Sequence, residues 1–127
     1  MKRDMDLFRK ILFELEEKFE PGLDILSDLK ISGYDMATIG DHCELLYQAG
    51  LLKYYNPQRG GMGNKLLFFN VGNLTNAGYD YLELIRNEKT WERTSEEINK
   101  NKLPNTIETI GKVAASIAGS FFREYNR

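Results

Sequence analysis

The sequence predicts a small α+β fold. Apolar residues recur at helical spacing in residues 4–19 and 36–49. Two runs of strand-forming residues, "LLKYY" and "LLFFNV", flank a glycine-rich connection, which is typical of a β-hairpin. The order of helix, short strand, helix, hairpin and helix is that of a winged helix-turn-helix-like domain.

Length and composition favour one soluble, cytoplasmic domain. The chain has 127 residues, of which 42% are apolar, and its net charge is −2 from 17 basic and 19 acidic residues. A role on nucleic acid therefore requires a local basic patch. The single cysteine, Cys43, excludes an internal disulfide and is typical of a reducing compartment. We expect the charged start "MKRDMDLFRK" not to be a signal peptide, and no stretch reaches the roughly 18 apolar residues of a membrane span.

The first helix is expected over residues 4–19, with Asp4 as its N-cap and Pro21-Gly22 as its end. Its apolar face consists of Met5, Phe8, Ile11, Leu12, Leu15 and Phe19. We expect Arg9, Lys10, Glu14 and Glu17 to face away from the core. Part of the following stretch "LDILSDLKI" is expected to be a strand.

The second helix is expected over residues 36–49, between an N-cap at Asp35 and a left-handed Gly50. A turn at Gly33 precedes it. Only one helix fits between Gly33 and Gly50, so the first helix of the usual pair is missing or reduced to a turn. Apolar positions Ile39, Cys43 and Leu46 share one face, and Asp41, Glu44 and Gln48 lie toward the other.

The segment "GLLKYYNPQRGGMGNKLLFF" (residues 50–69) has two readings, a phosphate-binding loop or the tip of a hairpin. A Walker loop requires G-x-x-x-x-G-K followed by Ser or Thr at the start of a helix. Here Asn64 precedes Lys65 and a strand follows it, and the glycines do not have the dinucleotide-binding spacing. The segment is therefore interpreted as the wing of a winged helix.

The C-terminal part is expected to be helical. Thr75 is the predicted N-cap of a helix in "LTNAGYDYLELIRN", residues 99–106 form a linker, and a last helix covers residues 106–124. Trp91 is expected to fill the core between the fourth helix and the C-terminal segment. These features divide the chain into a winged-helix domain, 1–90, and a C-terminal helical extension, 91–127.

The last helix suggests a homodimer contact. Its predicted buried residues are Ile107, Ile110, Val113, Ile117 and Phe121. Its narrow side consists of Gly111, Ala115, Ala118 and Gly119. A second copy can approach this side closely, and a dimer would present two wings with two-fold symmetry. The alternative is that the helix packs back on the first helix and completes the core of a monomer.

The leading hypothesis is a non-enzymatic transcriptional regulator that binds duplex DNA. The cations Lys53, Arg59 and Lys65 surround the wing tip, and Lys2 and Arg3 lie near the N-terminus with Arg9 and Lys10. Such side chains neutralise phosphates, while Gln48 and Thr38 are the candidates for contact with base edges. The alternative is that these cations only keep a glycine-rich loop solvated.

The carboxylates of the second helix oppose this reading. Asp41 and Glu44 are expected to face outward, where DNA phosphates repel them. The runner-up hypothesis is therefore a non-enzymatic protein–protein interaction module on the same scaffold. An exposed acidic helix face would favour the interaction module, and a contiguous basic surface joining the wing and the N-terminus would favour DNA.

Three separated motifs carry a resemblance to a known family. They are "MKRDMDLFRKILFELEE", "GY" followed by "HCELLYQAGLL", and "LTNAGYDYLELIRNEKTWERT". With these motifs and the C-terminal "SIAGSFF", the chain closely resembles the bacterial and phage domain-of-unknown-function 2513 family (DUF2513). It is more distantly similar to the YjcQ-like winged-helix proteins. The resemblance implies a winged-helix fold, often encoded by phages or prophages, and no established activity.

No catalytic set is evident. His42 is the only histidine, so neither a catalytic triad nor a zinc site is expected, and its predicted role is packing or hydrogen bonding. Cys43 is interpreted as buried and inert. We therefore expect no enzyme activity, no cofactor, no metal and no small-molecule ligand.

Overall fold

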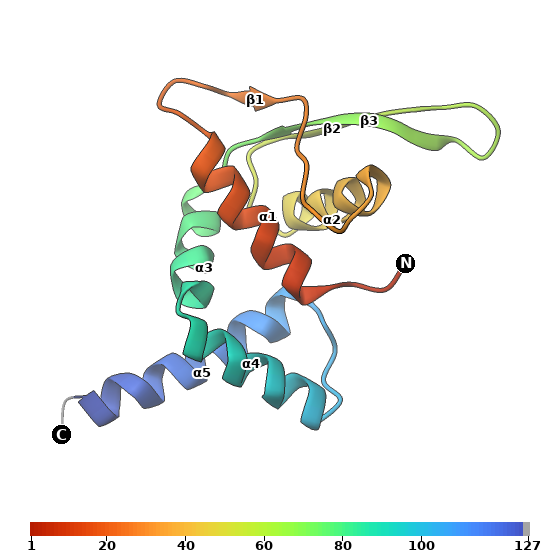
Figure 1. The fold of residues 1–127 in the computed structure, drawn as a ribbon. Coiled ribbons are helices and arrows are strands. Elements are labelled where there is room, and N and C mark those ends of the chain that lie inside the picture. Colours follow the sequence, from red (N-terminus) through yellow and green to blue (C-terminus); the bar gives the residue numbers. More distant parts are fainter. Residues whose placement is uncertain (126–127) are drawn as a thin grey trace.

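The computed structural model describes residues 1–125 and confirms the α+β class, with five helices and a three-stranded antiparallel sheet (Figure 1). In chain order the elements are α1 (Met5–Lys18), β1 (Ile25–Leu26), α2 (Met36–Gln48), β2 (Tyr55–Gly60), β3 (Lys65–Gly72), α3 (Asn76–Arg86), α4 (Glu88–Lys100) and α5 (Ile107–Tyr125). The arrangement of α1, α2, the hairpin and α3 is compatible with a winged helix.

Helix α1 lies at the centre of the fold, in contact with α2 and α3 (Figure 1). Asp4 is its N-cap, as predicted, because its carboxylate accepts a hydrogen bond from the Leu7 amide at 3.1 Å. The buried residues of the helix are Met5, Leu7, Phe8, Ile11, Leu12 and Leu15. At roughly 1.5–3 kcal/mol for each large side chain, this stripe is a main source of folding free energy.

Arg9 does not face solvent as expected. Its guanidinium donates hydrogen bonds to the carbonyl oxygens of Ile85 and Arg86, at 3.0 and 2.9 Å, and so satisfies the C-terminal end of α3. It also lies 5.4 Å from the Trp91 ring centroid. The Trp91 indole in turn donates to Asp6 of α1, so this side chain joins α4 to α1 rather than to the C-terminal segment alone.

Only α2 lies between β1 and β2, as the sequence predicted. Residues 27–35 form a loop in which Gly33 has φ of +90°. The Asp35 carboxylate caps α2 by accepting from the Thr38 amide at 2.7 Å. Hydrogen bonding with the Thr38 side chain, and then with its amide, lowers the pKa of Asp35. Gly50 follows the helix with φ of +82°, the left-handed conformation that was predicted.

The predicted hairpin is confirmed, but β2 begins later than expected. Of "LLKYY" only Tyr55 belongs to β2, while Leu52 forms an isolated bridge with Leu74. The polar stretch from Asn56 to Gly60, predicted as loop, pairs with the apolar strand β3. Pairing with β3 therefore outweighs the low strand propensity of these residues. The turn at residues 61–64 has positive φ at Gly61, Gly63 and Asn64.

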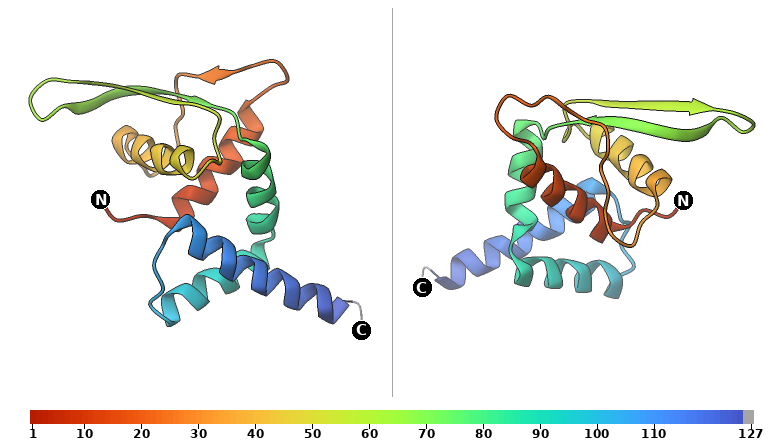
Figure 2. Two further views of the ribbon diagram at one scale, coloured as in Figure 1. Left: turned by 180° about the vertical axis from the view of Figure 1, so that it is seen from behind. Right: turned by 45° about the horizontal axis from the view of Figure 1, so that its top comes forward.

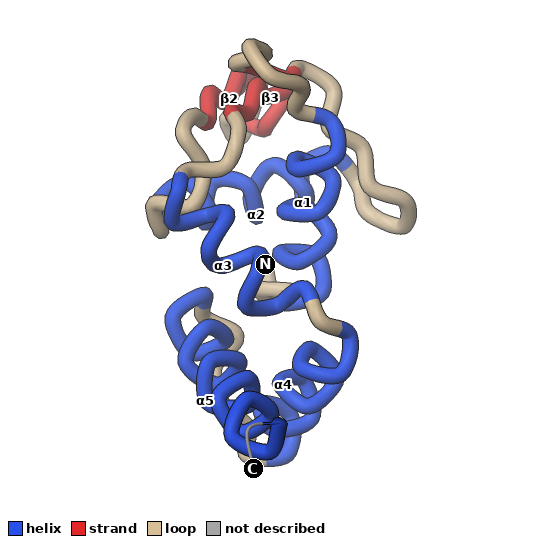
Figure 3. Tube along the Cα trace, turned by 90° about the vertical axis from the view of Figure 1, so that its left-hand side faces the viewer, coloured by secondary structure: helices blue, strands red, loops and turns tan. Residues whose placement is uncertain are grey.

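Helices α4 and α5 form a pair beside the rest of the fold (Figure 3). Helix α5 packs mainly on α3 and α4 instead of on α1, and among its described side chains only Ile110 and Ala114 are buried. Gly111 faces Tyr81 of the same chain, while Ala115 is exposed. A dimer contact through this helix remains a prediction, and the predicted division after residue 90 falls within α4.

His42 joins α2 to the start of α1. Its side chain is fully buried, and its Nε2 accepts a hydrogen bond from the Asp4 amide at 2.9 Å. Its Nδ1 therefore carries the proton and donates to the Thr38 carbonyl at 2.8 Å. The ring also lies 5.0 Å from that of Phe8. The predicted packing role is confirmed, and both ring nitrogens are occupied.

Replacing His42 tests this junction. In His42→Leu the partly buried Asp4 amide loses its acceptor, so the free energy of unfolding should fall by about 2 kcal/mol, or roughly 7 °C in melting temperature. Thermal unfolding followed by circular dichroism measures the change. His42→Gln, which keeps an amide acceptor, should lose less; equal losses in both variants would contradict the role of the hydrogen bond.

Gly78 provides a second test, of the contact between α3 and the chain before β2. A Cβ atom at this position would lie 2.1 Å from the Leu51 carbonyl oxygen, a backbone atom that cannot rotate away. Gly78→Ala should therefore destabilise the protein by about 3 kcal/mol. Gly119→Ala on α5 is the matched control, since its nearest neighbour is the Arg123 guanidinium at 3.7 Å. There alanine should stabilise by about 0.5–1 kcal/mol, and equal effects of the two changes in chemical denaturation would refute this account.

Candidate interaction surface of the wing and α2

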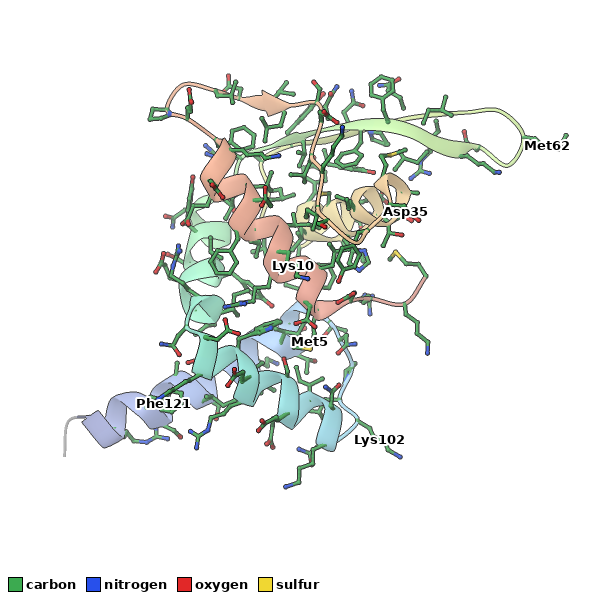
Figure 4. The ribbon with its side chains drawn as sticks, viewed as in Figure 1. Met5, Lys10, Asp35, Met62, Lys102 and Phe121 are labelled. Carbon is green, nitrogen blue, oxygen red and sulfur yellow. The ribbon has the colours of Figure 1, made fainter. Side chains whose placement is uncertain are left out.

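The wing, defined as residues 55–72, projects past α2 and away from the helices (Figure 2). Leu66 and Phe69 of β3 pack over Gly40 of α2, where a Cβ atom would lie 2.4 Å from Leu66 Cδ2. The missing side chain at Gly40 lets the strand lie directly on the helix. Met62 marks the free end of the wing and Asp35 the start of α2 (Figure 4).

Arg59 points back toward α2. Its Nη2 lies 3.9 Å from Asp41 Oδ1 and 3.6 Å from Glu44 Oε2, and its side chain is 32% exposed. Pairs this accessible stabilise by only about 0.2–1 kcal/mol each, but they neutralise the cation locally. Gln48 lies beside the same group, with its amide 3.5 Å from Glu44. Helix α2 itself contains no lysine or arginine.

The other predicted contact residues are spread over separate places. Lys53 precedes β2 and Lys65 begins β3, and both are exposed. Lys2 and Arg3 lie in the N-terminal arm, where they line a groove with Leu45 and Asn105. Thr38 is half-buried, and its carbonyl is bonded to His42. The structure brings Arg59 and Gln48 together. It leaves the wing lysines, Lys53 and Lys65, apart from the cations of the N-terminal arm.

The carboxylates of α2 separate these cations. Asp41 and Glu44 both lie on α2. The wing packs on this helix through Leu66 and Phe69, and the N-terminal arm lies beside it at Leu45. The described residues therefore form no contiguous basic surface from wing to N-terminus. The hairpin and its flanking segments are positively charged in sequence, because residues 45–79 contain three cations and no acidic residue.

Sequence reasoning missed an apolar group on the outer face of the sheet. Leu67 is 59% exposed and Phe68 is 51% exposed, and Ile25 of β1 and the adjacent Tyr54 are also accessible. The run "LLFF" could have predicted this group. Successive side chains of a strand point to opposite faces, so four apolar residues in a row must place some on the exposed face when only one face is buried. Large side chains exposed on a projecting element are typical of a binding surface.

Tyr55 lies beneath this face, buried against Phe69 with ring centroids 5.8 Å apart. Its hydroxyl has no hydrogen-bond partner among the described residues. Burial, followed by the nearby charge of Glu44, raises the pKa of Tyr55 to about 12. Burial likewise raises the pKa of Cys43, as expected for an unreactive thiol.

The described residues contain no group of three or more His, Cys, Asp or Glu side chains that could hold a metal ion. Over the same residues, none of the helices combines the length and apolar character needed to cross a bilayer. What the surface offers is a projecting strand pair with apolar and cationic side chains, next to an acidic helix.

Comparison with known proteins identifies the family. Residues 2–104 match the family described as "Hypothetical protein (DUF2513)". An uncharacterised protein of Haemophilus influenzae is 32% identical over 117 residues, which cover 92% of this chain and 95% of that protein. No solved structure matches the chain. The family match ends before α5 and so does not include "SIAGSFF", although the resemblance drawn from the sequence did. The chain belongs to the DUF2513 family.

The buried Tyr55 hydroxyl yields a prediction about pH. Since its pKa is about 12 in the folded chain, against 10.0 ordinarily, its neutral form adds stability that is present below pH 10 and lost as the pH rises toward 12. Tyr55→Phe should leave stability at pH 7 unchanged within about 1 kcal/mol, because the hydroxyl has no partner to lose. It should also reduce the loss of stability between pH 10 and 12.

Tyr81→Phe is the control for this measurement. The Tyr81 hydroxyl donates to the Ile107 carbonyl at 2.8 Å, so its removal should cost about 1 kcal/mol at pH 7. Denaturant titrations of the three proteins at pH 7, 10 and 11.5 make the comparison. A Tyr55→Phe variant that is clearly destabilised at pH 7 would show that the hydroxyl is bonded after all.

Proposed function

We propose that the protein is a non-enzymatic interaction module that binds another protein through the wing and the exposed side of α2. The observation that carries this proposal is the pairing of Arg59 with Asp41 and Glu44. The cation best placed on a DNA-binding wing is engaged by carboxylates on the helix that would enter the groove. The exposed Leu67 and Phe68 beside it supply the apolar contact that a protein partner buries.

Electrostatics and burial both support a protein partner. A phosphate near α2 would meet Asp41 and Glu44, and binding there would have to separate them from Arg59. A protein surface can instead cover the apolar wing and keep these ion pairs. The buried Cys43 supports a reducing, cytoplasmic setting. If the gene belongs to a phage, as the resemblance leads us to expect, the partner is a host factor.

Duplex DNA is the second candidate. It is supported by the exposed Lys2, Arg3, Lys53 and Lys65, which form no ion pair among the side chains that the structure describes. It is also supported by the lack of acidic residues from 45 to 79. If the partner is DNA, the wing lysines contact phosphates, and Gln48 and Thr38 lie near base edges. The protein would then act as a transcriptional regulator.

Site-specific photocrosslinking tests the leading proposal. The photoreactive amino acid p-benzoylphenylalanine replaces Phe68 or Tyr47, both exposed, and in the control it replaces Glu92 on the outside of α4. In cells that carry the gene, we expect the first two positions to crosslink to the same protein and the control to give no such product. Crosslinking from Glu92 alone would contradict the proposal.

A salt titration separates the second candidate from the first. The chain and a Lys53→Ala/Lys65→Ala variant are titrated with a labelled random-sequence duplex at several salt concentrations. The leading proposal predicts no binding tighter than about 10⁻⁴ M at physiological salt for either protein. Tighter binding, with a salt slope that falls by roughly 1 to 2 in the variant, would favour DNA.

A further inference from the structure

The two outer edges of the sheet differ in their capacity to accept another strand. The strand order is β1-β3-β2, so β3 is central, but β1 pairs only with Val71 and Gly72. From Asn70 to Lys65, the side of β3 away from β2 has no partner strand, and this stretch is named the open edge (Figure 2). The outer edge of β2 carries Pro57, which has no N–H to donate.

The direction of the backbone groups follows from one hydrogen bond. The Gly72 amide donates to the Tyr54 carbonyl at 2.9 Å, so the polar groups of Gly72 face β2. In an antiparallel pair the direction alternates along the strand, which turns Asn70 toward β2 and Phe69 toward the open edge. Because Pro57 is paired with Phe69, its backbone faces the outer side of β2, where the missing N–H blocks strand addition.

Side chains beside the open edge favour a particular kind of strand. Leu67 is the extra residue of a β-bulge, since Gln58 pairs with Phe68 and Arg59 pairs with Leu66. Leu67 and Phe68 are exposed next to the free backbone groups, and Lys65 stands at the outer end. With no acidic residue from 45 to 79, the hairpin favours a segment that carries carboxylates.

We propose that the open edge of β3 accepts an extended, acidic segment of a partner protein as a fourth strand of the sheet. The proposal rests on the proposed function and specifies how the partner is held. Backbone hydrogen bonds to Phe69 supply the pairing, an apolar residue of the segment packs on Phe68, and a carboxylate pairs with Lys65. This is the mode in which a peptide extends an exposed sheet edge.

The probe for the test is a displayed library of random dodecapeptides, selected on the full chain. We expect the selected peptides to alternate apolar and acidic residues. Phe68→Asn should weaken their binding about tenfold, since it removes the apolar cross-strand contact. Leu103→Asn is the control: an exposed apolar residue in the loop between α4 and α5, whose replacement should change the affinity less than twofold.

Amide hydrogen exchange measured by NMR distinguishes strand addition from contact of side chains alone. On peptide binding, exchange at the Phe69 amide should slow at least tenfold, while the Asn70 amide, which faces β2, should change little. Binding without protection of Phe69, or equal binding by Phe68→Asn, would overturn strand addition while leaving the crosslinking result for the proposed function intact. A chain dimer that Phe68→Asn dissociates would assign the edge to a second copy and also overturn the proposal.

Discussion

The partly buried hydrogen bond between the Asp4 amide and His42 determines how α2 lies against α1, and the position of the candidate surface depends on it. The same imidazole donates to Thr38, so one side chain links the first turn of each helix. Asp4 also accepts from the Tyr34 hydroxyl at 2.9 Å, which ties the loop before α2 to this junction. The loop thus provides the support that the missing helix of a helix-turn-helix pair would otherwise give.

The wing takes its orientation from α2 chiefly through close packing. Strand β3 lies against Gly40, where a Cβ atom would lie 2.4 Å from Leu66 and 3.0 Å from Phe69, so the strand packs directly on the helix backbone. The accessible ion pairs of Arg59 add little stability, but they neutralise its positive charge on the surface of the wing. The result is a projecting strand pair with exposed apolar side chains beside an acidic helix.

Local chemistry made much of the fold predictable. The caps at Asp4, Asp35 and Thr75 depend on residues three positions apart, and each forms as expected. Contacts between distant elements were not predictable in the same way. The turn of Arg9 toward α3 and the bond from Trp91 to Asp6 depend on how helices pack, which periodicity does not encode. At the candidate site, the pairing of Arg59 with α2 depends on strand register, and the register includes a bulge that no local pattern indicated.

Amide chemical-shift mapping of the isotope-labelled chain, as the crosslinked partner is added, tests the proposed wing and α2 surface most directly. The perturbed amides should lie in β3 between Lys65 and Asn70 and on the exposed side of α2, with α4 and α5 unaffected. Perturbations confined to α4 and α5 would contradict it, because the partner would then bind a surface that neither the wing nor the His42 junction positions.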